Sequence, residues 1–162
     1  MTQAIQPRQA AAAPVVTELL TIAYLMELET VANYLAASVN LDGIRAQEVA
    51  RALEADVEEE LGHARRLAER LNQLDGVVPG SRDLIVRQSS LQPTGDPTDV
   101  EVVIRGVLEA EDAAIAHYRR LVETTDGVDW VTQDLAISIL ADEEAHRRLF
   151  EGFLREYESV SG

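Results

Sequence analysis

The chain has 162 residues and no cysteine, which excludes disulfide bridges and metal sites built on thiolates. Its 14 basic and 29 acidic residues give a formal charge of −15, which argues against direct binding to the phosphate backbone of DNA. Hydrophobic residues make up 46% of the chain but aromatic residues only 4%, a balance that favours an all-α fold over a sheet.

The acidic excess has two open interpretations: it keeps the protein soluble, or it attracts cations. The chain has no apolar run long enough for a membrane span, and its first 14 residues lack the order of a secretory signal. We therefore expect a cytoplasmic protein without a membrane partner.

Residues 1–13 are rich in Ala and Gln and predict a flexible N-terminal tail. The remainder, residues 14–158, predicts a single domain. Pro14 suits the first turn of a helix. Apolar residues then recur at helical spacing, but Glu27 interrupts their stripe and Tyr34 follows seven residues later. A carboxylate on a buried stripe is costly unless it is paired or bound to a metal.

A second helix is predicted over residues 44–74, after a turn in which Asp42 is a candidate N-cap. Glu60 and His63 lie within its apolar stripe, together with Leu53 and Val57. Residues three apart lie on one side of a helix, so Glu60 and His63 present a carboxylate and an imidazole together.

Residues 75–97 contain several glycines and prolines and predict a crossover. A connection of this length can return the chain to the other end of a bundle, which makes the second and third helices parallel. A short ordered piece is expected at residues 84–86.

Thr98 and Glu101 fit a capping box at the start of the third helix, whose inner stripe contains Glu111 and Tyr118. Residues 124–127 end this helix. Asp129 can cap a fourth helix that extends to about Tyr157. Its apolar stripe contains Glu143 and His146, which repeat the arrangement of Glu60 and His63.

The two halves of the chain follow one pattern. Each has a helix with Glu followed by Tyr seven residues later, and then a helix with Glu-x-x-His. The chain therefore resembles a duplicated helical hairpin with an approximate two-fold axis. In that arrangement six side chains converge at mid-bundle: Glu27, Glu60, His63, Glu111, Glu143 and His146.

Four buried carboxylates need neutralisation, and two divalent cations would supply it. Carboxylates with imidazole suit iron or manganese, and also zinc, whereas a dinuclear site favours redox iron. We expect two iron ions per subunit, with Fe(II) oxidised by dioxygen or peroxide. All six residues are candidate catalytic residues and metal ligands.

Several other polar residues have plainer interpretations. Tyr34 and Tyr118 either donate hydrogen bonds or electrons at the centre, or simply pack in the core, and packing is the better single expectation for each. Four glutamates are expected on the solvated face: Glu29, Glu59, Glu109 and Glu144. Of these, Glu59 and Glu144 stay candidates for a supporting or iron-uptake role, and His117 is expected at the surface.

At these residues the sequence resembles the ferritin-like superfamily, over about residues 15–157. Residues 27–34, ELETVANY, resemble the first-helix ligand segment of bacterioferritins, and residues 139–146, ILADEEAH, their fourth helix. Residues 96–101 and 108–115 are closer to the Dps-like subgroup that carries a bacterioferritin-type site. The resemblance implies an up-down-down-up four-helix bundle, ferroxidase activity, iron storage in a hollow shell and protection against peroxide.

The chain departs from those families at four points. Bacterioferritins bind haem through a methionine directly after the second-helix glutamate, but this chain has Leu61, so no haem is expected. The cysteine pair frequent in the Dps-like subgroup is missing. The chain ends soon after Tyr157, without the fifth helix of 24-subunit ferritins, which favours a 12-subunit homo-oligomer. The first 13 residues carry a single charge, Arg8, which argues against DNA binding through a basic tail.

Two enzyme alternatives remain beside the leading one: a rubrerythrin-like peroxidase without mineral storage, and a haem-free bacterioferritin. A third alternative is a non-enzymatic four-helix interaction module whose polar core sets the register of the helices.

Overall fold

The computed structural model describes residues 7–161, and within this range the chain forms four long helices, two short 3₁₀ helices and no strand. The helices are α1 (Pro7–Asn40), α2 (Gln47–Gln73), α3 (Val100–Thr125) and α4 (Trp130–Ser161). The 3₁₀ helices are η1 (Ile44–Ala46), directly before α2, and η2 (Ser81–Asp83), within the crossover. None of the described helices is long and apolar enough to cross a membrane.

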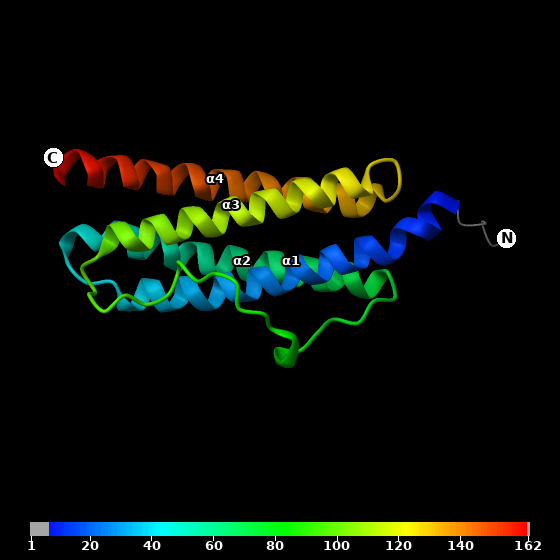
Figure 1. The fold of residues 1–162 in the computed structure, drawn as a ribbon, viewed down its shortest axis with the longest axis horizontal. Coiled ribbons are helices and arrows are strands. Elements are labelled where there is room, and N and C mark those ends of the chain that lie inside the picture. Colours follow the sequence, from blue (N-terminus) through cyan, green and yellow to red (C-terminus); the bar gives the residue numbers. More distant parts are fainter. Residues whose placement is uncertain (1–6, 162) are drawn as a thin grey trace.

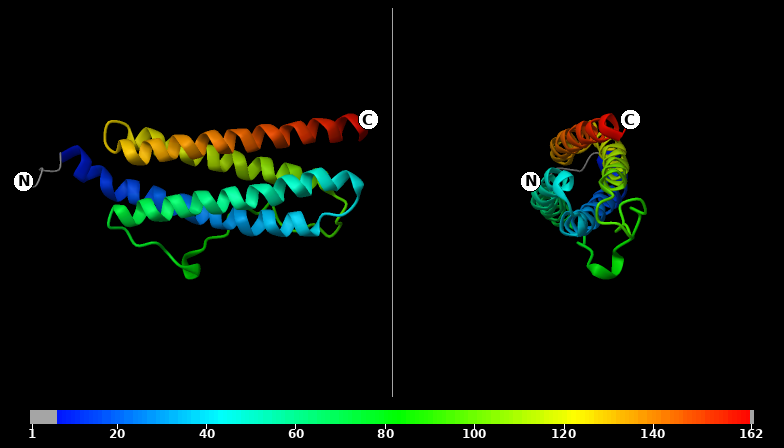
Figure 2. Two further views of the ribbon diagram at one scale, coloured as in Figure 1. Left: turned by 180° about the vertical axis from the view of Figure 1, so that it is seen from behind. Right: turned by 90° about the vertical axis from the view of Figure 1, so that its left-hand side faces the viewer.

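The four helices form an up-down-down-up bundle, as the sequence predicts (Figure 1). α1 packs chiefly against α2, and α3 chiefly against α4. The crossover runs back along the outside of the bundle from the end of α2 to the start of α3, so α2 and α3 are parallel (Figures 1 and 2). The two antiparallel hairpins of the predicted duplication are therefore present in the fold.

α1 begins earlier than the sequence predicts. The predicted tail covers residues 1–13, but residues 7–13 are helical and Pro14 lies inside the helix. A proline lacks the N–H that an interior helical position uses, so the chain tolerates the loss of one hydrogen bond there. Residues 1–6 of the predicted tail lie outside the described residues.

The helix starts also differ in detail from the predicted caps. Asp42 accepts a hydrogen bond only from the N–H of Gly43, and the 3₁₀ helix η1 precedes α2. At α3 the N-cap is Asp99, one residue after the predicted Thr98, and its carboxylate accepts from the N–H of Val102. The ordered piece expected at residues 84–86 is displaced to η2, and residues 84–86 themselves are extended or irregular.

The start of α4 agrees with the predicted cap. The carboxylate of Asp129 accepts from the N–H of Thr132 at 3.1 Å. Arg70 of α2 donates to the same carboxylate at 2.8 Å and to the Thr132 hydroxyl at 2.8 Å. The cap of α4 is thus held by a side chain of α2, which ties the two hairpins together at this end.

The crossover is attached to the outer face of α1 and to α3. The carboxylate of Glu29 accepts from the backbone N–H groups of Arg87 and Gln88 at 2.7 and 2.8 Å. On the α3 side, a Cβ built at Gly106 would lie 2.5 Å from the carbonyl oxygen of Ser90. Only glycine lets the crossover approach α3 this closely.

The apolar core consists of two clusters. One contains Leu53, Ile104 and Phe150, and the other contains Leu20, Leu67 and Ile139. The Glu and His residues predicted at mid-bundle belong to neither cluster but are buried as well. The bundle therefore encloses a polar layer between two apolar ends.

Candidate metal centre

All four helices contribute to the polar layer. α1 supplies Glu27 and α3 supplies Glu111, whereas α2 and α4 each supply a Glu-x-x-His pair. Every one of these six side chains is at most 6% exposed: Glu27, Glu60, His63, Glu111, Glu143 and His146. The structure therefore brings together all six residues that the sequence singled out.

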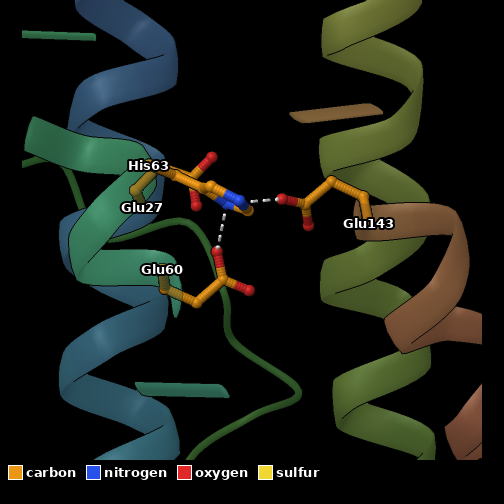
Figure 3. A group of neighbouring side chains, drawn as sticks. All are labelled: Glu27, Glu60, His63 and Glu143. Atoms are coloured by element: carbon orange, nitrogen blue, oxygen red, sulfur yellow. Dashed lines mark hydrogen bonds and ion pairs between the residues drawn. The ribbon is translucent and has the colours of Figure 1, made fainter. Parts of the chain in front are cut away.

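One group of donors comes from α1, α2 and α4. Figure 3 shows Glu27, Glu60, His63 and Glu143 directed toward one another. The Nδ1 atom of His63 lies 3.1 Å from Glu60 Oε2 and 3.2 Å from Glu143 Oε1. One ligand atom from each of the four residues lies within 4.8 Å of those of the others, which is a spacing that a single cation can span.

A second group repeats this geometry about the pseudo-two-fold axis. It consists of Glu60, Glu111, Glu143 and His146, again with ligand atoms within 4.8 Å of one another. The Nδ1 atom of His146 lies 3.2 Å from Glu60 Oε1 and 3.8 Å from Glu111 Oε1. Glu60 and Glu143 belong to both groups, so either carboxylate would be able to contribute to both if two ions were bound.

The unpartnered atoms of the layer fit bound cations. In the described part of the chain, five buried side-chain atoms have no hydrogen-bond partner, and four of them belong to this layer: Glu60 Oε1, Glu111 Oε2, Glu143 Oε1 and His146 Nδ1. Glu60 Oε1 and His146 Nδ1 approach within 3.2 Å without the alignment of a hydrogen bond. Lone pairs that converge in a buried site are costly unless a cation or a proton lies between them.

The carboxyl groups of the layer titrate abnormally when no metal is bound. Burial, together with the charges of Glu143 and Glu60, raises the pKa of Glu27 well above its usual value. Burial also raises the pKa of Glu111 to about 7, and burial with the charges of Glu60 and Glu111 raises that of Glu143 strongly. The metal-free layer therefore retains protons that bound cations would displace.

The pKa values of Glu60 and of the two imidazoles shift against the effect of burial. Burial would raise the pKa of Glu60, but the close imidazoles of His146 and His63 lower it to about 2. Burial would lower the pKa of His63, yet the hydrogen bond to Glu60 and the charge of Glu27 raise it to about 9. The pKa of His146 rises to about 10 in the same way, through Glu60 and Asp56. The raised pKa values favour protonated imidazoles, whose positive charge offsets part of the negative charge of the carboxylates.

Each tyrosine of the repeat reaches across to the other hairpin. Tyr34 on α1 donates its hydroxyl to Glu111 on α3, and Tyr118 on α3 donates to Glu27 on α1. Both rings are fully buried. The two tyrosines thus pack in the core and also orient the two outer carboxylates.

Carboxylates behind the imidazoles complete the centre. Glu59 Oε2 lies 3.1 Å from His146 Nε2, and Asp142 Oδ2 lies 3.1 Å from His63 Nε2. A carboxylate on Nε2–H fixes the tautomer that leaves Nδ1 free to bind a metal. Glu59 is 48% exposed, which agrees with its expected place on the solvated face, and its contact with His146 is compatible with the supporting role left open for it.

Besides Asp142, the sequence analysis missed Asp56. It is 6% exposed, it lies one turn before Glu60, and its Oδ2 atom is the fifth buried atom without a partner. Burial raises its pKa to about 6, although the charge of His146 opposes this. The spacing of four residues between Asp56 and Glu60 was the available signal.

Two expectations for surface residues are wrong. Glu29 is buried, at 9% exposure, because the crossover covers the outer face of α1 and donates two N–H groups to it. His117 is half-buried, and its Nε2–H donates to the carbonyl of Leu19 at 2.9 Å. By contrast, Glu109 is exposed, and the exposed Glu144 pairs with Arg119 at 2.8 Å rather than with the centre.

Comparison with known proteins agrees with this architecture. Residues 17–160 match the family model described as a ferritin-like domain. The chain is 30% identical over 141 residues to the DNA protection during starvation protein of Pyrococcus furiosus, a match that covers 85% of this chain and 75% of that protein.

Two solved structures share the fold. The bacterioferritin of Desulfovibrio desulfuricans, described as having a diiron site, superposes with a TM-score of 0.80 at 26% identity, over 96% of this chain and 86% of that one. The dodecameric thioferritin of Bacteroides fragilis superposes with a TM-score of 0.79 at 22% identity, over 92% of this chain and 89% of that one.

Proposed function

This chain belongs to the family of ferritin-like domains, and we propose that it is a ferroxidase that oxidises Fe(II) and stores Fe(III) inside a hollow homo-oligomer. Its relatives include a bacterioferritin and a DNA protection during starvation protein, and these similarities support a role in iron handling. The proposal assigns the metal-binding role to the six buried residues of the polar layer.

The observation that carries the proposal is the pair of overlapping donor groups. Each group has one imidazole and three carboxylates, and Glu60 and Glu143 are common to both. Two ions that share bridging carboxylates can lose one electron each to a single oxidant molecule. Hard carboxylate oxygens with imidazole suit iron, and manganese or zinc are possible occupants of the same donors.

The reaction balances with either oxidant. Two Fe(II) ions lose one electron each, and peroxide accepts both electrons with two protons to give two molecules of water. Dioxygen accepts the same two electrons and two protons to give hydrogen peroxide. The raised pKa values of Glu27, Glu111 and Glu143 mean that these side chains carry protons before the ions bind and release them on binding.

The protein's own residues hold the donors in position. Tyr34 and Tyr118 orient the outer carboxylates, and Glu59 and Asp142 orient the imidazoles. The apolar clusters at both ends of the layer exclude bulk water from it. Because these donors are already held in position, they need not rearrange when the charge of the bound ions increases during oxidation.

Oxidation of Fe(II) tests the proposal directly. Fe(II) is added to the metal-free protein with peroxide or air, and the ferric absorbance is followed. We expect the wild-type chain to oxidise Fe(II) far faster than buffer and Glu60→Ala to fall to the buffer rate. Glu58→Ala, an exposed carboxylate on the same helix, is the matched control and should retain the wild-type rate. Equal rates for Glu60→Ala and wild type would contradict the proposal.

We further propose a closed 12-subunit shell rather than 24 subunits. The thioferritin of Bacteroides fragilis, which shares the fold, is described as dodecameric. Native mass spectrometry of the purified protein measures the number of subunits. A monomer or dimer that still turns over peroxide would instead favour a rubrerythrin-like peroxidase without mineral storage, and 24 subunits would favour a haem-free bacterioferritin.

Protection against oxidative stress would follow from the removal of Fe(II) and peroxide. The formal charge of −15 argues against direct binding of DNA, so protection by this chain would act through iron rather than through contact with DNA. Metal analysis of the purified protein separates this proposal from a purely structural bundle, which would contain no metal and keep its stability in chelator.

A further inference from the structure

A cavity of about 380 Å³ opens on the outside of the bundle, where the crossover packs between α1 and α3. Met26 of α1 and Leu91 of the crossover line it, and none of the six residues of the polar layer does. Its volume falls in the range of about 300–1,000 Å³ that is typical of small-molecule sites. The cavity is therefore large enough for a ligand of its own.

The floor of the cavity belongs to α3 and is apolar. Gly106, Ala110, Ala113 and Ala116 line it, and residues three or four apart share one face of a helix. At the rise of an α-helix these positions extend over about 15 Å. An extended apolar chain can lie along this floor and lose its contact with water there.

One end of the cavity is positively charged. Arg87 of the crossover and Arg120 of α3 both line it, and within the described part of the chain neither guanidinium has an ion-pair partner. Burial lowers the pKa of His117, which also lines the cavity, and the charges of Arg120 and Arg87 lower it further against the hydrogen bond to Leu19. Both arginines thus act on the same end of the cavity.

Two carboxylates also line the cavity but do not neutralise this end. Glu29 accepts hydrogen bonds from the backbone N–H groups of Arg87 and Gln88 at 2.7 and 2.8 Å. Glu109 is exposed and precedes Arg120 on α3 by about 16 Å at the rise of an α-helix. The arginine end therefore stays available to an anionic group.

We propose that this cavity binds an amphipathic carboxylate, with its head at Arg87 and Arg120 and its apolar chain along the α3 floor. A carboxylate forms strong, charge-assisted hydrogen bonds with guanidinium groups. The apolar floor adds the burial of the chain, which a small anion lacks. This site does not depend on the proposed oxidation of iron.

Binding of decanoate to the assembled protein tests the site by isothermal titration calorimetry. We expect one decanoate per subunit. Butanoate keeps the head but lacks most of the chain, and 1-decanol keeps the chain but lacks the charge. Each of them should bind at least about tenfold more weakly than decanoate, because each loses one of the two contributions.

Variants at the head distinguish this cavity from other apolar surfaces. Arg87→Gln and Arg120→Gln should each weaken decanoate binding about tenfold, because each removes a charged donor. Arg87→Gln retains the backbone N–H on which Glu29 depends. Arg82→Gln is the matched control: it removes an exposed arginine of the crossover that does not line the cavity, and it should bind as the wild type does.

A variant of the floor tests the position of the apolar chain. Ala113→Leu places a larger side chain in the cavity and should abolish binding, whereas Ala55→Leu, at an exposed position of α2, should leave it unchanged. Saturating decanoate should raise the melting temperature of the wild type and of Ala55→Leu but not of Ala113→Leu.

A crystal structure with decanoate shows directly where the ligand lies. Density along α3 with the carboxylate at Arg87 and Arg120 would support the site. No binding by the wild type, density elsewhere on the molecule, or equal affinities for the wild type and the Ala113→Leu and Arg120→Gln variants would each overturn it.

Discussion

Individual carboxyl groups determine how the metal-free protein responds to pH. The pKa of Glu111 is raised to about 7, and those of Glu27 and Glu143 are raised well above 4.5, with burial as the largest cause. A group whose pKa is raised on folding stabilises the fold fully below its unfolded pKa, and this contribution disappears as pH rises through the folded pKa. For these three groups the loss begins near pH 4.5 and continues through about 7 for Glu111.

We therefore predict that in chelator the melting temperature falls between pH 5 and pH 8. The pKa values of His63 and His146 rise from 6.5 to about 9 and 10, so their contribution begins to be lost near pH 6.5 and adds to the fall. The contribution of Glu60, whose pKa is about 2, is lost only in strong acid. Excess Mn(II) should reverse the trend, because cations bind the deprotonated groups. Thermal melts at a series of pH values measure both effects, and a melting temperature that rises toward pH 8 in chelator would contradict the assignment.

The hydroxyls of Tyr34 and Tyr118 should contribute alike to stability, since each donates to a buried carboxylate of the opposite hairpin. In chelator, Tyr34→Phe and Tyr118→Phe should each lower the free energy of unfolding by about 1–3 kcal/mol, the usual cost of an unpaired buried acceptor. Tyr24→Phe, at a half-buried position of α1, is the control and should change it by less than about 0.5 kcal/mol. Denaturant unfolding measures all three, and a cost in only one of the two buried tyrosines would argue against their equivalence.

Among the elements, the crossover depends on a single glycine of α3. A Cβ at residue 106 would lie 2.5 Å from the backbone oxygen of Ser90, which cannot move without displacing the crossover. Gly106→Ala should therefore destabilise the fold by about 1–3 kcal/mol, as overpacking does. Gly62→Ala is the matched control, because nothing lies within 4 Å of its Cβ position, and it should stabilise α2 by up to about 1 kcal/mol. Chemical unfolding that finds both substitutions equally tolerated would show that the crossover is not held against α3.

Sequence spacing predicted the helices and the convergence of six side chains, because both depend on helical periodicity and on the repeat. It missed Asp56, because Asp56 and Val57 both border the apolar stripe of α2 and only packing decides that Asp56 is the more buried. It misplaced Glu29, because the burial of that carboxylate depends on the path of the crossover, which follows no period. Local periodicity thus predicts helix faces, whereas contacts made by irregular segments require coordinates.

For the molecule as a whole, the formal charge of −15 should accelerate the capture of cations. Salt shortens the range of this attraction from about 30 Å at 0.01 M to about 3 Å at 1 M. We predict that the initial rate of Fe(II) uptake falls several-fold over this range, measured by stopped-flow absorbance. The dependence of oxidation on peroxide concentration is the control, because peroxide is uncharged and should show little effect of salt. An uptake rate that does not change with salt concentration would indicate that the acidic surface serves solubility alone.

The repeat of Glu27, Glu60 and His63 as Glu111, Glu143 and His146 has a consequence for assembly. Either hairpin carries half of the donors, so hairpins contributed by two different chains could rebuild the same pair of ion positions. The 75–97 connection is what lets the two hairpins of one chain meet. A shortened connection that cannot span this distance would favour a domain-swapped dimer. In that dimer each centre would be intact but would combine hairpins from two polypeptides.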